Sequence, residues 1–268
     1  MPGSRAFTIL EIPYHLGALE IGVGKGPRRI VASGADGRLA YRGVPAQVQH
    51  ISLRDKSCEG VDAIVDLARQ TRVAVRQAVE QQIVPVVVSG NCIACVGTLG
   101  GLDPWRLGIV WLDAHADFHT PATSRSGSLS GMALSVATGA CHEELCSRIG
   151  YAEPVPAANV LLPCARDIEP GERERVEAAG FAQSAEELGE RADSVYLHID
   201  LDFLSPAESP GVHFRGPGGL PVKEGAALIA SIMRELPVVA VGLTNYNPDL
   251  DEDGRSLAAV NRLLEALL

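Results

Sequence analysis

The 268-residue sequence predicts an α/β fold in which a mostly parallel sheet is covered by helices on both faces. Short runs rich in β-branched residues alternate along the chain with segments of helical spacing, a pattern typical of βαβ units. Most of the runs are apolar throughout, as expected for strands buried on both faces. No linker rich in Pro, Gly or Ser separates two hydrophobic halves, so we expect a single domain over residues 1–268.

Seven short runs are the predicted strands: residues 7–10, 48–53, 83–88, 107–112, 160–162, 195–199 and 238–243. Helical spacing of apolar residues is clearest over 64–79 and 257–267. Two stretches have the composition of loops, 120–129, rich in Ser and Thr, and 205–221, rich in Pro and Gly. In parallel sheets ligands bind beyond the carboxyl ends of the strands, so the residues that follow each run are the functional candidates.

Composition and charge restrict the partners of the chain. It has 33 acidic against 23 basic residues, a net charge of −10 and a pI near 5.2, so we expect no binding to nucleic acid or to an anionic membrane. No run approaches the roughly 20 apolar residues of a membrane span, and residues 1–10 lack the order of a signal peptide, so the cytoplasm is the expected compartment. Six cysteines are too few for a disulfide scaffold. Small molecules and metal ions are the expected partners.

Metal-binding side chains follow two of the predicted strands. Asp113, His115 and Asp117 come after 107–112 with a spacing of two, which places all three on one side of an extended segment. Asp200 and Asp202 follow 195–199 with the same spacing. A lone Asp-x-Asp is often a solvated turn, but four carboxylates gathered without cations would repel one another. The pattern predicts two divalent ions that share carboxylates, and such a pair activates water for hydrolysis.

Further motifs accompany these residues over most of the chain: Thr120-Pro121, Ser126-Gly127, Arg166-Asp167-Ile168-Glu169-Pro170-Gly171-Glu172, Pro206, Pro210-Gly211 and Asn247-Pro248. With them, the sequence resembles the ureohydrolase family of arginases, agmatinases and formiminoglutamases. The resemblance implies a three-layer α/β/α fold, a site with two Mn²⁺ ions, and hydrolysis at a guanidino or formimino carbon. It also implies that Asp113 and Asp200 bridge both ions, that Asp117 completes one site, and that His115 with Asp202 completes the other.

The first metal ligand of that family departs from the family pattern in this chain. The family has a His in a Gly-Gly-Asp-His-Ser stretch, where this sequence reads Ser89-Gly90-Asn91-Cys92-Ile93. Cys92 therefore occupies the ligand position, and because a thiolate favours softer metals than manganese, other divalent ions stay open. The alternative is that Cys92 is a small buried residue in a degenerate site. A redox pair with Cys95 is the weaker interpretation, since a helix should begin near Cys92 and the ligand role already uses its sulfur.

Two catalytic positions of the family are also altered. Ser130 stands before Gly131, where arginases carry a His that shuttles protons, and His119 is the candidate replacement. Asn245 aligns with the carboxylate that pairs with a cationic guanidinium. Losing that charge favours a less basic substrate such as an N-hydroxyguanidine. The pattern is similar to the branch of the family that hydrolyses Nω-hydroxy-L-arginine to L-ornithine and hydroxyurea in antibiotic biosynthesis, where a Cys also replaces one His ligand.

The amino-acid end of the substrate has its own candidates. By analogy with arginases, Ser124, Ser126 and His119 would face an α-carboxylate, and Glu169 and Glu172 would face an α-amino group.

Several alternatives stay open at this point. The chain could act on an agmatine-like or formimino substrate, or could be a pseudoenzyme that binds metal without hydrolysis. His198 lies two residues before Asp200 but has no ligand role in the family pattern, so we interpret it as a core histidine or one that supports a ligand. Many arginases assemble through a C-terminal tail, whereas this chain ends with its last helix, so a monomer is expected and a homo-oligomer is the alternative.

Overall fold

The computed structural model describes residues 5–268, and its main feature is a parallel sheet with strand order β4-β1-β5-β9-β8-β6-β7. Its strands are β1 (Ala6–Ile12), β4 (Gln47–His50), β5 (Ile83–Ser89), β6 (Leu107–Leu112), β7 (Val160–Leu161), β8 (Ser194–Asp200) and β9 (Val238–Thr244). Each of the seven predicted strands overlaps a strand of this sheet, although residues 51–53 of the predicted strand 48–53 follow the end of β4, and the predicted fold class is confirmed. Residues 1–4 lie outside the described residues, and they include part of the 1–10 stretch in which we expect no signal peptide.

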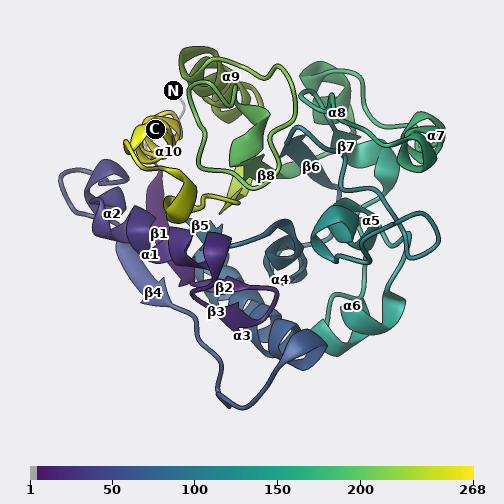
Figure 1. The fold of residues 1–268 in the computed structure, drawn as a ribbon, viewed down its shortest axis with the longest axis horizontal. Helices are drawn as coiled ribbons and strands as arrows, with labels where there is room; N and C mark the ends of the chain where they lie inside the picture. The colour runs from purple at the N-terminus through teal and green to yellow at the C-terminus, as the bar shows by residue number, and fades with distance from the viewer. Residues whose placement is uncertain (1–4) are drawn as a thin grey trace.

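Helices cover both faces of this sheet. They are α1 (Gly26–Ala32), α2 (Ala35–Arg38), α3 (Gly60–Glu80), α4 (Cys95–Gly100), α5 (Ala133–Ala137), α6 (Glu143–Ile149), α7 (Pro170–Ala178), α8 (Ala185–Arg191), α9 (Val222–Glu235) and α10 (Arg255–Glu265). Figure 1 shows α9 and α10 on the opposite side of the sheet from α3, α4 and α6. None of the helices within residues 5–268 combines the length and apolarity that a membrane crossing requires.

Two hydrophobic cores, one on each face, account for the apolar runs. In β8, Leu197 and Ile199 belong to the core beneath α1, α2, α8, α9 and α10, whereas Tyr196 belongs to the core beneath α3, α4, α5 and α6. Successive side chains of a strand point to opposite faces, so a strand between two cores must be apolar on both. This is the physical reason that the central strands lack the polar alternation of a half-exposed sheet.

The longest helix, α3, shows why the spacing of its apolar residues predicted it. Ile64, Leu67, Ala68, Val75 and Ala78 recur at intervals of three, four or their sums and are all buried. The exposed side is mostly polar, although Val61 and Val73 are exposed there. Burial of the apolar stripe against the sheet, more than intrinsic propensity, holds the helix in place.

The pairing register of the central strands places the site at one edge of the sheet. Trp111 on β6 pairs with His198 on β8, and His198 pairs with Gly242 on β9. Residues two positions later in each strand point to the same face, so Asp200 follows His198 there and Thr244, its partner on β9, follows Gly242. Trp111, His198 and Gly242 thus form one row across the sheet. Asp200 and Thr244 belong to a second row, nearer the carboxyl ends of the strands.

The loop over residues 205–221 is tied to this edge by Arg166. Its guanidinium donates to the carbonyl oxygens of Pro217 at 2.9 Å, of Asp202 at 2.9 Å and of Phe203 at 3.3 Å. Both stretches predicted as loops, 120–129 and 205–221, contain no helix or strand. Because one side chain binds both the loop and the end of β8, the loop has a defined position beside the candidate ligands.

Gly90 offers a test of how tightly the segment before Cys92 is packed. A Cβ at Gly90 would lie 2.2 Å from the carbonyl oxygen of Tyr14 and 3.1 Å from the Cα of Gly24. Gly90→Ala should therefore lower the free energy of unfolding by about 1–3 kcal/mol, measured by urea denaturation. Gly37→Ala is the control, since nothing lies within 4 Å of its added Cβ and alanine favours the helix. Wild-type stability of Gly90→Ala would contradict this packing.

Candidate metal centre

The candidate ligands come from the ends of four neighbouring strands, β5, β9, β8 and β6. Cys92 follows β5 at the start of a short 3₁₀ helix, Asp113, His115 and Asp117 follow β6, Asp200 ends β8 with Asp202 just beyond it, and Asn245 follows β9. Strand order, which the local pattern of the sequence does not reveal, is what brings these segments together. Sites on strand ends are held more rigidly than sites on loops.

A first group of donors lies on the β5 side of this edge. Ligand atoms of Cys92, Asp113, His198 and Asp200 lie within 4.8 Å of one another, and all four residues are buried. The thiol of Cys92 donates to Oδ2 of Asp200 at 3.1 Å. The sulfur therefore faces a carboxylate that the sequence also predicts as a ligand.

A second group consists of Asp113, His115 and Asp202. Nδ1 of His115 lies 2.9 Å from Oδ2 of Asp202 and 3.3 Å from Oδ1 of Asp113. Asp113 belongs to both groups, which is the placement that a carboxylate bridging two ions requires. Five of the six ligands predicted from the sequence thus fall into one or both groups.

Asp117, the sixth predicted ligand, is held beside the groups in a strained conformation. Its φ is +48°, in the left-handed region that non-glycine residues seldom adopt, and its carbonyl oxygen accepts bonds from the amides of Leu134 and Ser135. Its Oδ2 is buried without a hydrogen-bond partner among residues 5–268. Burial and the neighbouring Asp113 and Asp200 raise the pKa of Asp117 well above its ordinary value. An orphaned carboxylate oxygen here fits a cation as its partner.

The electrostatics of the groups also favour cations. Burial and the charge of Asp202 raise the pKa of Asp200 to about 7, and burial and the charge of Asp113 raise the pKa of Asp202 to about 6. Burial opposes the charged form of His115, but hydrogen bonds to Asp113 and Asp202 prevail and raise its pKa to about 12. Burial and nearby carboxylates raise the pKa of the Cys92 thiol. Divalent ions would displace these protons and remove the repulsion.

Asn245 covers the first group from β9. Its amide nitrogen donates to Oδ2 of Asp200 and, at 3.2 Å, to Sγ of Cys92. Its φ is +65°, a conformation that Asn tolerates better than most residues. A neutral donor thus stands where the family resemblance implies a carboxylate.

His198, which the sequence predicted to be a core histidine or one that supports a ligand, lies in the first donor group. It is fully buried, and burial lowers the pKa of its imidazole to about 3, so the ring is neutral. Its spacing of two from Asp200 places both side chains on one face of β8.

The predicted substrate residues include a compact trio. Nε2 of His119 lies 3.7 Å from carboxylate oxygens of both Glu169 and Glu172. Glu169 is exposed, whereas Glu172 is buried and accepts a bond from the amide of Phe118 at 2.7 Å. Burial raises the pKa of Glu172. Glu172 therefore anchors the segment that follows Asp117.

The predicted serines lie on one loop. Oγ of Ser124 accepts from the amide of Gly127 at 3.0 Å, and Oγ of Ser126 accepts from that of Ser128 at 3.2 Å. The amide of Ser130 donates to Oγ of Ser128 at 3.3 Å. These bonds shape the loop and none of them reaches the carboxylates, while the O–H groups of Ser124 and Ser126 are not used in them.

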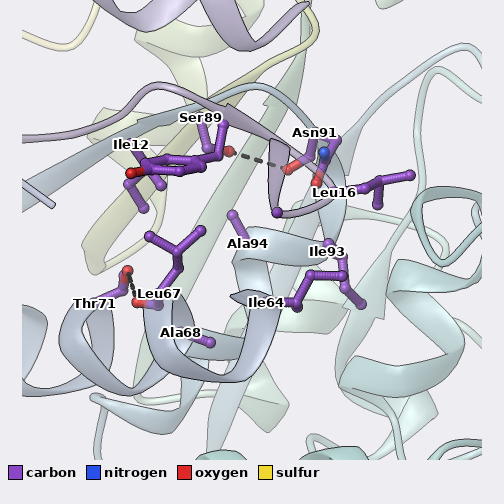
Figure 2. A pocket seen from close by; sticks show the side chains of 12 residues that line it. Ile12, Leu16, Ile64, Leu67, Ala68, Thr71, Ser89, Asn91, Ile93 and Ala94 are labelled. Carbon is purple, nitrogen blue, oxygen red and sulfur yellow. Dashed lines mark hydrogen bonds between the residues drawn. The ribbon is translucent and has the colours of Figure 1, made fainter. Parts of the chain in front are cut away.

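A small apolar pocket lies beside the segment that carries Cys92. Figure 2 shows Ile12, Leu67 and Ile93 among the side chains around it. Ser89 closes one side by donating to the carbonyl oxygen of Asn91 at 3.0 Å. The pocket is lined mostly by apolar side chains, and its polar members are Tyr14, Thr71, Ser89 and Asn91.

Comparisons with known proteins agree with this geometry. A model of the Arginase family matches residues 5–268. The arginases of Bacillus subtilis (strain 168) and Brevibacillus brevis are 27% and 28% identical to the chain, each over 98% of both sequences. The native structure of the arginase from Bacillus caldovelox superposes with a TM-score of 0.88 at 26% identity, again over 98% of both chains. The chain therefore belongs to the arginase family, the metal-dependent hydrolases that act on guanidino C–N bonds.

Proposed function

We propose that the protein is a binuclear-metal amidinohydrolase that cleaves Nω-hydroxy-L-arginine to L-ornithine and hydroxyurea. One observation carries the proposal: Cys92 and Asn245 stand in contact at the metal centre, where the family resemblance implies a His and a carboxylate. The same replacement of His by Cys marks the hydroxyarginine hydrolases of D-cycloserine biosynthesis, which the sequence resembles.

The donor groups fit two divalent ions. One would be held by His115 and Asp202 and the other by Cys92 and Asp117, with Asp113 and, by the family resemblance, Asp200 shared between them. Manganese is the ion that the family resemblance implies, and the sulfur of Cys92 also suits softer ions. When bound, such a pair of ions would lower the pKa of water and stabilise the tetrahedral intermediate that forms at the attacked carbon.

The neutral amide of Asn245 supports a substrate of low basicity. A guanidinium ion moved next to a buried site needs a counter-charge, and leaving it unpaired is costly. An N-hydroxyguanidine is less basic and can enter uncharged, so an amide that both donates and accepts hydrogen bonds can hold it.

Asp117 supplies the base for the reaction. With its unpartnered Oδ2 toward an ion, Asp117 would use its other carboxylate oxygen to hold the attacking water, accept its proton, and pass that proton to the nitrogen of the departing ornithine. The C–O bond would form first and give a tetrahedral intermediate, and the C–N bond to ornithine would break once that nitrogen carries the proton. Ser130 does not titrate near neutral pH, so His119, next to Glu169 and Glu172, is the group we assign to exchange the proton with solvent.

The α-amino and α-carboxylate groups of the substrate would bind at the loop beyond this base. The exposed carboxylate of Glu169 suits the amino group, and the O–H donors of Ser124 and Ser126, with His119, suit the carboxylate. Glu172, whose oxygen is already used by Phe118, would support this surface from beneath.

Hydrolysis of L-arginine is the second candidate function. The relatives that match over 98% of the chain are named arginases, and they support the ordinary family substrate. Both candidate functions use the same metal centre. They differ in the charge of the substrate, because arginine carries a cationic guanidinium and an N-hydroxyguanidine can bind uncharged.

Comparing the two substrates separates the candidates. We expect kcat/KM for Nω-hydroxy-L-arginine to exceed that for L-arginine at least about tenfold, a difference near 1.4 kcal/mol in transition-state stabilisation. Release of L-ornithine from each compound measures it. Equal or faster turnover of arginine would contradict the proposal in favour of the second candidate, and two bound ions without turnover of any guanidino compound would indicate a metal-binding pseudoenzyme.

Asn245→Glu restores the carboxylate that the family resemblance implies and should shift the substrate ratio about tenfold toward arginine. Asn245→Gln is the matched control, because it has the same length without the charge and should leave the preference for hydroxyarginine in place. Ornithine release from both substrates reports the ratio, and the same ratio in the two variants would show that charge at this position does not select the substrate.

Stability should depend on pH in opposite directions with and without metal. The pKa values of Asp200 and Asp202, about 7 and about 6, lie above their ordinary value of 3.8. The metal-free folded state therefore binds more protons than the unfolded state in this range, and its free energy of unfolding should fall between about pH 5 and about pH 8. Saturating Mn²⁺ should reverse the trend, because ions bind the ionised donors. Urea unfolding with and without a chelator tests this; chelated protein that gains stability over the same range would be the contrary result.

A further inference from the structure

The imidazole of His198 holds a buried nitrogen that the family pattern does not explain. Nδ1 lies 2.9 Å from the hydroxyl of Tyr196. Nε2 has no hydrogen-bond partner among residues 5–268, although the residue is fully buried. A buried polar atom without a partner costs free energy, so a native structure that retains one calls for a ligand or an ion at that point.

Three neighbours fix the orientation of this ring. The indole of Trp111 stacks on it with ring centroids 3.6 Å apart and an angle of 11° between the planes. On the other side, the paired strand carries Gly242, where a Cβ would lie 2.1 Å from the hydroxyl of Tyr196. The glycine therefore leaves the space in which the Tyr196 hydroxyl meets Nδ1. Because Trp111 fixes the plane of the His198 ring and Tyr196 holds Nδ1, the position of Nε2 is also fixed.

The imidazole lies beside the first donor group. A ring nitrogen of His198 lies with ligand atoms of Cys92, Asp113 and Asp200 in a set whose members are all within 4.8 Å of one another. Two donors of a single ion can be no further apart than twice the metal–ligand distance, about 4.6 Å for bonds of ~2.3 Å. The separations in the group, all within 4.8 Å, are thus close to the size of a coordination shell around one ion.

We propose that Nε2 of His198 is a ligand of the ion on the Cys92 side, in a donor set with Cys92, Asp113 and Asp200. The inference rests on the metal centre proposed above but is independent of the substrate. In the proposed metal-bound state Nδ1–H would donate to the Tyr196 hydroxyl, which is the tautomer whose Nε2 lone pair can bind metal. Trp111 adds a second link, because its Nε1 donates to Oδ2 of Asp113 at 3.2 Å.

The two ions then differ in chemical character. A set with one thiolate, one imidazole and two carboxylates is softer than the set of Asp113, His115 and Asp202. The ion bound by His198 is accordingly one for which Co²⁺ or Zn²⁺ competes well with Mn²⁺.

Cobalt-substituted wild-type protein provides a test that needs no variant. X-ray absorption on protein with two bound Co²⁺ ions should fit two histidine nitrogens per chain, one from His115 and one from His198. A fit with one histidine nitrogen would overturn the proposal, as would failure of the chain to bind metal at all. Binding of two ions together with absence of hydroxyarginine turnover would leave this inference intact while removing the proposed substrate.

Two variants and a control extend the test to affinity. His198→Phe keeps an aromatic ring on Trp111, removes both nitrogens, and should weaken binding of the more tightly held Co²⁺ at least about tenfold, with a smaller loss for Mn²⁺. Tyr196→Phe keeps the imidazole and releases Nδ1, so a loss of about tenfold is expected. The control is His142→Asn, since His142 also has a buried, unpartnered Nε2 but lies outside both donor groups. Titration with each metal measures these changes; wild-type Co²⁺ affinity in folded His198→Phe would contradict a ligand role.

Discussion

Repulsion among buried carboxylates is the constraint on which the rest of this molecule depends. Asp113, Asp117, Asp200 and Asp202 all lie buried at one edge of the sheet, and burial with mutual repulsion raises the pKa of each. Such a cluster is unfavourable unless protons or cations neutralise it. The fold holds it in place through contacts that do not involve the charges, including the backbone bonds to Asp117 and the grip of Arg166 on the end of β8. The site is thus prepared for cations by a scaffold whose stability comes from the two apolar cores.

The parallel register turns this edge into a layered structure. The outer row carries charged donors such as Asp200, and the row one step further into the sheet carries Trp111, His198 and Gly242. The stacked Trp111 ring on β6, the Tyr196 hydroxyl on β8 and the space left by Gly242 on β9 position the imidazole of His198, so neighbouring strands support the donor group. Rotamers locked in this way hold donors to the tolerance that metal coordination demands.

Sequence patterns predicted the strands because burial on both faces leaves uninterrupted apolar runs. Period-two spacing at strand ends predicted four of the grouped residues, Asp113, His115, Asp200 and Asp202, whereas the family resemblance pointed to Cys92. Other features depend on neighbours distant in the chain. The environment of His198 is set by Trp111 and Gly242, which lie beside it because β6 and β9 both pair with β8, and no local sequence pattern predicts that pairing. Glu172 matched a motif for substrate contact, yet its burial and its bond to Phe118 assign it to the support of a loop. The bonds of Asn245 to Cys92 and Asp200 likewise required the order of β5, β9 and β8.

The two replacements at Cys92 and Asn245 are best understood as one change. A neutral His and a charged carboxylate, as the family resemblance implies, together contribute a charge of −1, and a thiolate with a neutral amide contributes the same. In the proposed metal-bound state the charge would be conserved but relocated: it would leave the side that meets the guanidino group and lie on Cys92. The contact of 3.2 Å between the Asn245 amide and the Cys92 sulfur gives this proposal a physical basis, because the amide donor would stabilise a thiolate formed on metal binding. Under the proposed function, such a centre would keep enough negative charge to hold two cations and would lack the carboxylate that pairs with a cationic substrate.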